Sequence, residues 1–227
     1  MDAAGQVLIA QRPPGKHLAG GWEFPGGKLE PGEERLAGLA RELREELGIT
    51  IRKPRPLIRV RHTYPYGDVL LDVWVIRHYS GEPRGLDGQA LRWCTQEELA
   101  TVDLLPADGP IVRALRLPER LTQVSSRDYT VGDARSLGDR AGGEPGAEAP
   151  GAEAINGPRL HGVFCANTDA AVGAAKAGSE FLVMRHALGD AELVALCDSV
   201  PVPVFARGIA LQRAWALGAS GLNEICR

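Results

Sequence analysis

The sequence predicts an α/β protein in two sections, and two observations carry that prediction. Strand-like runs alternate with helix-like runs along most of the 227 residues, which is typical of α/β domains. The alternation stops once, at SLGDRAGGEPGAEAPGAEAINGP (136–158), where Gly, Ala, Glu and Pro replace almost all large apolar side chains. Such a composition favours a linker, because it cannot bury a core. We therefore expect domains at residues 1–118 and 159–227, joined by a flexible linker at 119–158.

In the first section, short runs rich in β-branched and aromatic residues predict strands between turn residues. These runs are VLIAQR (7–12), LIRVRHTY (57–64), DVLLDVWVIRHY (68–79) and LRWCT (91–95). Two short helices are expected, QEELATV (96–102) after the N-cap candidate Thr95, and PIVRAL (110–115) after the turn-like PADG.

A third, acidic helix is expected within GGKLEPGEERLAGLARELREELGI (26–49). Its buried stripe consists of four leucines at helical spacing, Leu36, Leu39, Leu43 and Leu47. Glu33 and Glu34 are expected in its first turn, where negative charge is favourable, and Gly48 at its C-terminal stop.

Three carboxylates share one flank of this helix at positions i, i+3 and i+4, namely Glu42, Glu45 and Glu46. Crowded carboxylates repel one another unless a cation binds, and several hard oxygens suit Mg²⁺ or Mn²⁺. Taken alone, the run RELREEL is also compatible with a solvated surface helix held by ion pairs.

The spacing from Gly27 to Ile49 is G-x5-E-x7-R-E-L-x-E-E-x-G-I, which resembles the Nudix hydrolase signature at every defined position. WEFPGGK (22–28), DGQ (87–89) and LPADGPIVRAL (105–115) resemble the MutT-type branch of that family, which hydrolyses 8-oxo-dGTP. The resemblance implies a Nudix α/β/α sandwich with a mixed β-sheet for the first section.

The same resemblance implies a site that holds Mg²⁺, with Mn²⁺ as a substitute. The implied metal ligands are the carbonyl of Gly26 and the side chains of Glu42, Glu45 and Glu46, with Glu45 and Glu46 also catalytic. The implied structural supports of the site are Gly27, Glu33, Arg41 and Gly48. A bound metal would lower the pKa of a water molecule, which would then attack a phosphorus of the triphosphate.

Arg12 and Lys28 match basic positions of the family and are expected to contact phosphates, although a solvated surface base is the alternative for each. Phe24 is expected to line the base pocket, and an ordinary core position is the alternative.

Two aspartates stand where the family carries other residues. Asp87 replaces a glutamate assigned as general base or extra metal ligand, and could instead be a turn residue of GLDGQ. Asp108 replaces an asparagine that contacts the base, and could instead cap the helix that follows. An ionised aspartate only accepts hydrogen bonds, so it would repel O6 of 8-oxoguanine.

The first section also departs from the family at its start, because only MDAAG precedes VLIAQR. Nudix domains usually begin with a further strand, rich in Val and Ile, that belongs to the central sheet. We therefore expect a sheet whose first strand is missing, which would expose backbone groups of its neighbours.

The second section alternates four strand-like runs, HGVFCA, EFLVM, VPVFA and GLNEI, with Ala-rich helical runs, which predicts about four strands in parallel βαβ units. Their order resembles the carboxy-terminal half of thiamine phosphate synthase and its TenI relatives. A complete (β/α)8 barrel needs at least about 200 residues, so we expect a partial barrel-like domain without thiamine chemistry. Three alternatives stay open for it: packing on the first domain, dimerisation that covers open edges, or a poorly folded remnant.

Composition limits the classes of function. A formal net charge of −3 gives no broad attraction to nucleic-acid polymers or acidic membranes, so a small-molecule nucleotide is the expected partner. No leader or membrane span is evident, which favours a cytoplasmic protein. The four cysteines, Cys94, Cys165, Cys197 and Cys226, form no CxxC pair and are expected to be reduced thiols.

We therefore expect Mg²⁺-dependent hydrolysis of 8-oxo-dGTP to 8-oxo-dGMP and pyrophosphate, which sanitises the nucleotide pool and prevents mutation. One alternative is a Nudix pyrophosphatase that acts on another nucleoside diphosphate derivative. Another is a catalytically weak nucleotide-binding or regulatory protein.

Overall fold

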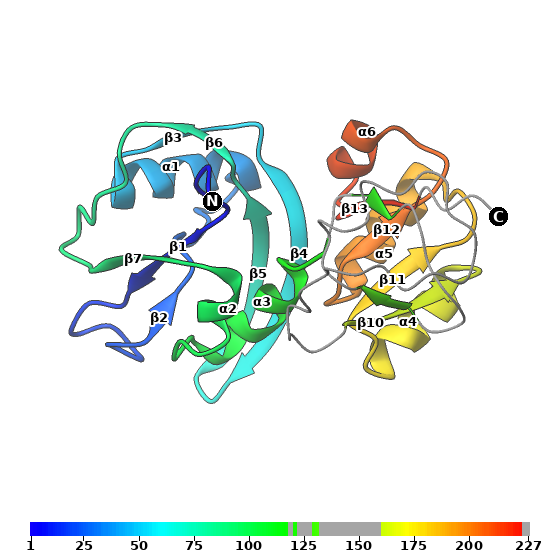
Figure 1. The fold of residues 1–227 in the computed structure, drawn as a ribbon, viewed down its shortest axis with the longest axis horizontal. Helices are drawn as coiled ribbons and strands as arrows, with labels where there is room; N and C mark the ends of the chain where they lie inside the picture. The colour runs from blue at the N-terminus through cyan, green and yellow to red at the C-terminus, as the bar shows by residue number, and fades with distance from the viewer. Residues whose placement is uncertain (118–119, 122–128, 132–159, 224–227) are drawn as a thin grey trace, which may run out of the picture. The chain divides into compact units, whose positions relative to one another are not determined.

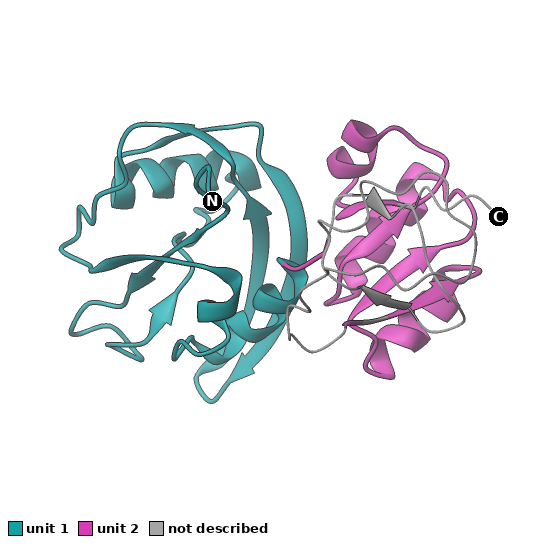
Figure 2. Cartoon of the chain, viewed as in Figure 1, with its two compact units in different colours: residues 1–115 teal, residues 116–227 magenta. Residues whose placement is uncertain are grey.

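A computed structural model describes residues 1–117, 120–121, 129–131 and 160–223 (Figure 1). The chain forms two compact units, Met1–Leu115 and Arg116–Arg227 (Figure 2). Most of the predicted linker at 119–158 lies outside the described residues, so the domain boundaries stay a prediction. No helix in the described part of the chain is long and apolar enough to cross a membrane.

The strands of the first unit form three small sheets. Strand β1 (Val7–Gln11) lies between β2 (Trp22–Glu23) and β7 (Leu91–Cys94) and is antiparallel to both. Strands β4 (Arg55–Tyr64) and β5 (Gly67–Val75) form a long antiparallel hairpin, and β3 (Thr50–Arg52) pairs with β6 (His78–Ser80).

No strand among the described residues joins these three sheets, so the predicted mixed sheet is discontinuous. Among the described residues of the first unit, the only parallel pairing is an isolated bridge between Trp22 and Leu104. The strand predicted at 68–79 was wrong in its length, since β5 ends at Val75 and β6 begins at His78. In the break, the carbonyl of Ile76 accepts a hydrogen bond from the Met1 ammonium at 2.7 Å.

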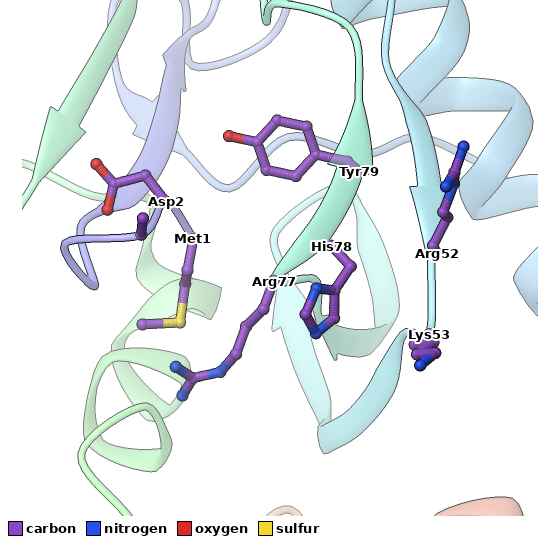
Figure 3. A pocket seen from close by; sticks show the side chains of 8 residues that line it. Met1, Asp2, Arg52, Lys53, Arg77, His78 and Tyr79 are labelled. Carbon is purple, nitrogen blue, oxygen red and sulfur yellow. The ribbon is translucent and has the colours of Figure 1, made fainter.

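A hollow of about 560 Å³ opens beside this break (Figure 3). It is lined by Met1, Asp2, Ala3, Arg52, Lys53, Arg77, His78 and Tyr79. Arg52 and Lys53 lie on one side of it in Figure 3, and Met1 and Asp2 on the other. None of these residues belongs to the acidic helix.

The acidic helix is α1 (Arg35–Leu47), and Leu43 and Leu47 pack with Leu8 and Ile49 in a buried cluster. Gly48 ends it with a left-handed φ of 69°, as predicted, and its N–H donates to carbonyls of the last turn. The prediction that Glu33 and Glu34 lie in the first helical turn was wrong. Glu34 is the N-cap instead, because its carboxylate accepts from the N–H groups of Leu36 and Ala37.

Three short helical segments complete the first unit. Helix α2 (Gln96–Leu99) begins with a capping box between Thr95 and Glu98. A 3-10 turn, η1 (Pro106–Asp108), leads directly into α3 (Gly109–Ala114). Ile111 and Ala114 of α3 pack against the β4–β5 hairpin.

The four strands predicted in the second unit are present and parallel, in the order β13 (Gly221–Asn223), β12 (Val204–Ala206), β11 (Phe181–Met184) and β10 (Leu160–Cys165). They alternate with α4 (Thr168–Lys176), α5 (Asp190–Ser199) and α6 (Leu211–Ala216). Within the predicted linker, β9 (Tyr129–Val131) pairs antiparallel with β10, and β8 (Arg120–Leu121) pairs parallel with β13.

The core of each unit contains cysteine thiols. Cys94, Cys165 and Cys197 are buried and form no disulfide, and Cys226 lies outside the described residues. The α/β class is confirmed for both units.

Candidate functional site

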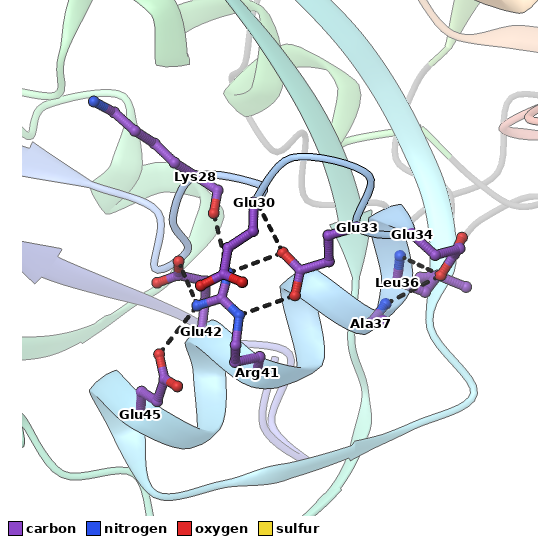
Figure 4. Close-up of polar contacts among 9 residues, drawn as sticks. All are labelled: Lys28, Glu30, Glu33, Glu34, Leu36, Ala37, Arg41, Glu42 and Glu45. Carbon is purple, nitrogen blue, oxygen red and sulfur yellow. Dashed lines mark hydrogen bonds and ion pairs between the residues drawn. The ribbon is translucent and has the colours of Figure 1, made fainter.

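Arg41 contacts most of the acidic groups around α1 (Figure 4). Its Nε and Nη2 donate to the two oxygens of Glu33 at 2.9 and 3.0 Å. Its Nη1 donates to Glu42 at 2.9 Å and to Glu45 at 3.1 Å, and Nη2 also donates to the carbonyl of Lys28 at 3.1 Å. Arg41 therefore ties the glycine-rich turn to the helix.

The bidentate ion pair with Arg41 lowers the pKa of Glu33 to about 2, with a further contribution from the N–H of Glu30. The carboxylates around it raise the pKa of Arg41 above its usual range. Both groups are therefore fully charged at neutral pH.

Gly27 lies directly against the Glu42 carboxylate. A Cβ built on Gly27 would overlap the carboxyl carbon and both oxygens of Glu42. A side chain at position 27 would therefore displace Glu42, which explains why the turn needs glycine there.

The three carboxylates of the helix flank do not share one environment. Glu46 is half-buried and lines a cleft, whereas 61% of the Glu45 side chain is exposed and its carboxylate pairs with Arg41. Burial, followed by the nearby charge of Glu42, raises the pKa of Glu46. Among the described residues, no three His, Cys, Asp or Glu side chains are close enough to hold one metal ion.

The cleft gathers residues from four separate segments of the first unit. Its lining consists of Ala10, Gln11, Pro13, Lys16, Glu23, Phe24, Pro25, Gly26, Glu46, Asp87 and Gln89. Four of the predicted site residues, Phe24, Gly26, Glu46 and Asp87, therefore meet in one place. Glu42 lies close enough for its charge to act on Glu46.

Arg12 and Lys28 are differently placed from the other predicted site residues. The Nε of Arg12 donates to Glu23 at 3.0 Å, and its Nη1 donates to the carbonyl of His17 at 2.9 Å. The partly exposed guanidinium of Arg12 is thus engaged by groups of the protein itself. The exposed side chain of Lys28 extends away from Arg41 and Glu42 in Figure 4.

Asp108 is buried, with 5% of its surface exposed, and it makes no side-chain cap to α3. The N–H of Phe24 donates to its carboxyl group, but Oδ2 has no hydrogen-bond partner among the described residues. Burial first, and then the charge of Glu23, raises the pKa of Asp108 to about 7. Phe24 lines the cleft and also packs on the core, and its contact with a base stays a prediction.

Aromatic rings lie close to Asp108. Tyr64 accepts a hydrogen bond from the N–H of Ala107 at 3.4 Å and stacks on Tyr66 with ring centroids 4.9 Å apart. His17 meets Tyr66 edge-on at 4.0 Å. His62 and Tyr64 alternate on β4 and Tyr66 follows in the turn, and this spacing is the sequence pattern that could have indicated the row.

Sequence reasoning also missed Lys16, Glu23 and Gln89 in the cleft. Lys16 stands beside Gly15, whose φ of 89° favours glycine and marks a turn before the WEFPGGK segment. Gln89 was noticed only as part of DGQ, without a role.

Comparison with known proteins identifies the family of the first unit. A model described as the NUDIX domain matches residues 1–114, half of the chain. The CTP pyrophosphohydrolase of Escherichia coli K12 is 39% identical over 114 residues, which cover 50% of this chain and 84% of that protein. The chain belongs to the Nudix family.

Two further similar proteins carry related names. The 8-oxo-dGTP diphosphatase of Escherichia coli K12 is 33% identical over 111 residues, covering 49% of this chain and 86% of the relative. The solved structure of a MutT NUDIX hydrolase from Burkholderia pseudomallei is 30% identical, covers 49% of this chain and 86% of its own, and gives a TM-score of 0.42. The family match ends at residue 114, so the thiamine phosphate synthase resemblance of the second section stays a prediction.

Proposed function

We propose that the first unit hydrolyses a nucleoside triphosphate to the monophosphate and pyrophosphate with bound Mg²⁺ or Mn²⁺, and that 8-oxo-dGTP is the first candidate substrate. The main support for this proposal is that one cleft is lined both by the polar groups of Gly26, Glu46 and Asp87 and by the aromatic ring of Phe24. The first three suit a cation, which would in turn bind the phosphate chain, and an aromatic ring suits a base. The 33% identity with an 8-oxo-dGTP diphosphatase supports this assignment.

The chemistry of the proposed donors suits a hard divalent cation, while their three carboxylates are too far apart in this structure to hold one ion together. Glu42 and Glu46 bring two carboxylates close together, and the side-chain carboxylate of Glu46 receives no hydrogen bond from the described residues. We assign the metal to Glu42, Glu45, Glu46 and the Gly26 carbonyl. When bound, the ion would neutralise phosphate charge and lower the pKa of a coordinated water.

The chain's own residues have distinct roles in this proposal. Glu46, half-buried and with a pKa raised by burial and by the charge of Glu42, is suited to accept a proton. Asp87 lies near enough for its charge to act on Glu46 and is a second acceptor. Glu33 and Arg41 hold the turn and helix in place, and Phe24 and Asp108 bind the base.

CTP is the second candidate substrate, and Asp108 is the observation that favours it. An ionised carboxylate accepts hydrogen bonds from the N4 amino group of cytosine. A neutral carboxyl group instead donates to O6 of 8-oxoguanine and accepts from its N7–H. The 39% identity with a CTP pyrophosphohydrolase supports this alternative.

The test is pyrophosphate release from 8-oxo-dGTP, dGTP and CTP with Mg²⁺, comparing wild type, Glu46→Gln and the control Glu82→Gln. Glu82 is an exposed glutamate paired with Arg84 outside the cleft, so its variant should retain wild-type activity. We expect Glu46→Gln to lose about a hundredfold or more in kcat. Absence of activity on all three nucleotides, with folding verified by circular dichroism, would contradict the proposal and favour a nucleotide-binding or regulatory role.

For the second unit, we propose a truncated domain of the thiamine phosphate synthase type that has no thiamine chemistry. Four parallel strands that alternate with helices support it. Formation of thiamine phosphate by the purified chain would contradict it.

A further inference from the structure

The cleft carries several acidic side chains, although its proposed ligand, a triphosphate, is itself negatively charged. Glu23, Glu46 and Asp87 all line it. A triphosphate carries several negative charges of its own, so a tight complex needs cationic groups from the protein as well as a divalent ion.

Arg12 and Lys28, which were expected at the phosphates, and Arg41, which was expected to support the site, are poorly placed for this task. Arg12 donates to Glu23 and to the His17 carbonyl, and Arg41 is engaged by Glu33, Glu42 and Glu45. Lys28 is exposed and directed away from Glu42 in Figure 4. None of the three lines the cleft.

Lys16 is the only basic residue among those that line the cleft. Its side chain has no hydrogen bond or ion pair with the described residues. It is nevertheless near enough to Glu46 and Glu23 for its charge to act on both carboxylates. Lys16 thus supplies a positive charge beside the expected position of the cation.

The loop that carries Lys16 is anchored on both sides of that residue. The N–H of Gly20 donates to the Arg12 carbonyl at 3.0 Å, which closes the loop at its base. The guanidinium of Arg12 donates to the carbonyl of His17, the residue after Lys16. The backbone at Lys16 is therefore held over the cleft, while its long side chain can still adjust to a ligand.

We propose that Lys16 binds the phosphate chain of the substrate. Its ammonium group offers three N–H donors and one full positive charge, and lysine is a common phosphate ligand in proteins. The inference rests on the proposed function and adds to it a binding residue that the family motif does not contain.

The test measures binding without turnover. Calorimetry with Mg²⁺ would compare a non-hydrolysable α,β-methylene nucleoside triphosphate with the corresponding monophosphate. Lys16→Gln should weaken binding of the triphosphate analogue by about tenfold or more, and that of the monophosphate by less than about twofold. Lys16→Arg should restore most of the affinity. Lys53→Gln, in the hollow at the β3–β6 sheet, is the matched control and should bind as wild type does.

Two readouts separate this role from a structural one. The effect of Lys16→Gln should shrink as salt is raised, because exposed charges are screened. In hydrolysis assays KM should rise more than kcat falls. Equal affinity of wild type and Lys16→Gln for the analogue, with an active wild type, would contradict the role of Lys16 alone. A wild type that neither binds the analogue nor hydrolyses a triphosphate would overturn the proposed function itself.

Discussion

The side-chain amide of Gln89 donates a hydrogen bond from Nε2 to the backbone carbonyl of Glu46, 3.1 Å away. Its Oε1 accepts from the N–H of Asp87 at 2.9 Å. The N–H of Leu86 also donates to the Glu46 carbonyl, at 2.9 Å. The loop before β7 is therefore fastened to the end of α1, which sets Asp87 beside Glu46.

We expect Gln89→Ala to impair catalysis more than folding, because it releases both contacts that fix Asp87 relative to Glu46. The loss of stability should be about 1–2 kcal/mol, and kcat should fall by about tenfold. Gln96→Ala is a matched control, since Gln96 also donates its side-chain amide to a backbone carbonyl, that of Leu115 at 3.0 Å. Chemical denaturation would measure the stability of the Gln89→Ala and Gln96→Ala variants, and initial rates would measure their kcat. A wild-type kcat for Gln89→Ala would refute the positioning role.

Gly27→Ala should disable the site while the fold remains. Its added methyl group would overlap the Glu42 carboxylate, which must then move away from Gly26 and Glu46. We expect a loss of activity of about a hundredfold, with a circular dichroism spectrum like that of wild type. Gly173→Ala is the control, because a Cβ at this position of α4 meets open space. That variant should gain up to about 1 kcal/mol of stability and keep full activity.

Local sequence signals predicted the elements around the site well. Helical spacing of leucines and a terminal glycine were enough to predict α1 and its end at Gly48, because periodicity and caps act within a few residues. The same holds for the N-cap at Thr95 and for the four strands predicted in the second unit.

Contacts between distant segments could not be predicted in this way. Arg12 was expected at a phosphate, but Glu23, eleven positions away on β2, engages it. The break between β5 and β6 is the site where the Met1 ammonium binds Ile76, 75 positions away. The roles of Lys16 and Gln89 likewise depend on which segments meet at the cleft, and no short motif encodes that.

The Glu33–Arg41 pair should make stability depend on pH at the acidic end. The pKa of Glu33 falls from 4.5 to about 2 on folding, so its contribution is present above about pH 4.5 and is lost as the pH falls towards 2. Glu33→Gln should therefore be less stable than wild type at neutral pH, and the difference should vanish near pH 2. Thermal unfolding at a series of pH values would show this. A difference that stays constant with pH would point to a cause other than the ion pair.

Asp108 should make the choice of base depend on pH. With a pKa of about 7, its carboxyl group is mostly neutral below that pH and mostly ionised above it. The neutral form complements O6 and N7–H of 8-oxoguanine, whereas the ionised form complements the amino group of cytosine. The ratio of kcat/KM for 8-oxo-dGTP to that for CTP should therefore fall by about tenfold or more from about pH 6 to about pH 8.

The ratio of the two kcat/KM values cancels most pH effects that are common to both substrates. Ionisation of Glu46 affects both reactions and largely cancels, and Glu23 and Arg12 are the charged neighbours that act on Asp108. In Asp108→Asn the ratio should no longer change with pH, because the amide does not titrate in this range, and it should favour 8-oxo-dGTP throughout. A ratio that is flat in wild type, or that keeps its slope in Asp108→Asn, would show that Asp108 does not contact the base.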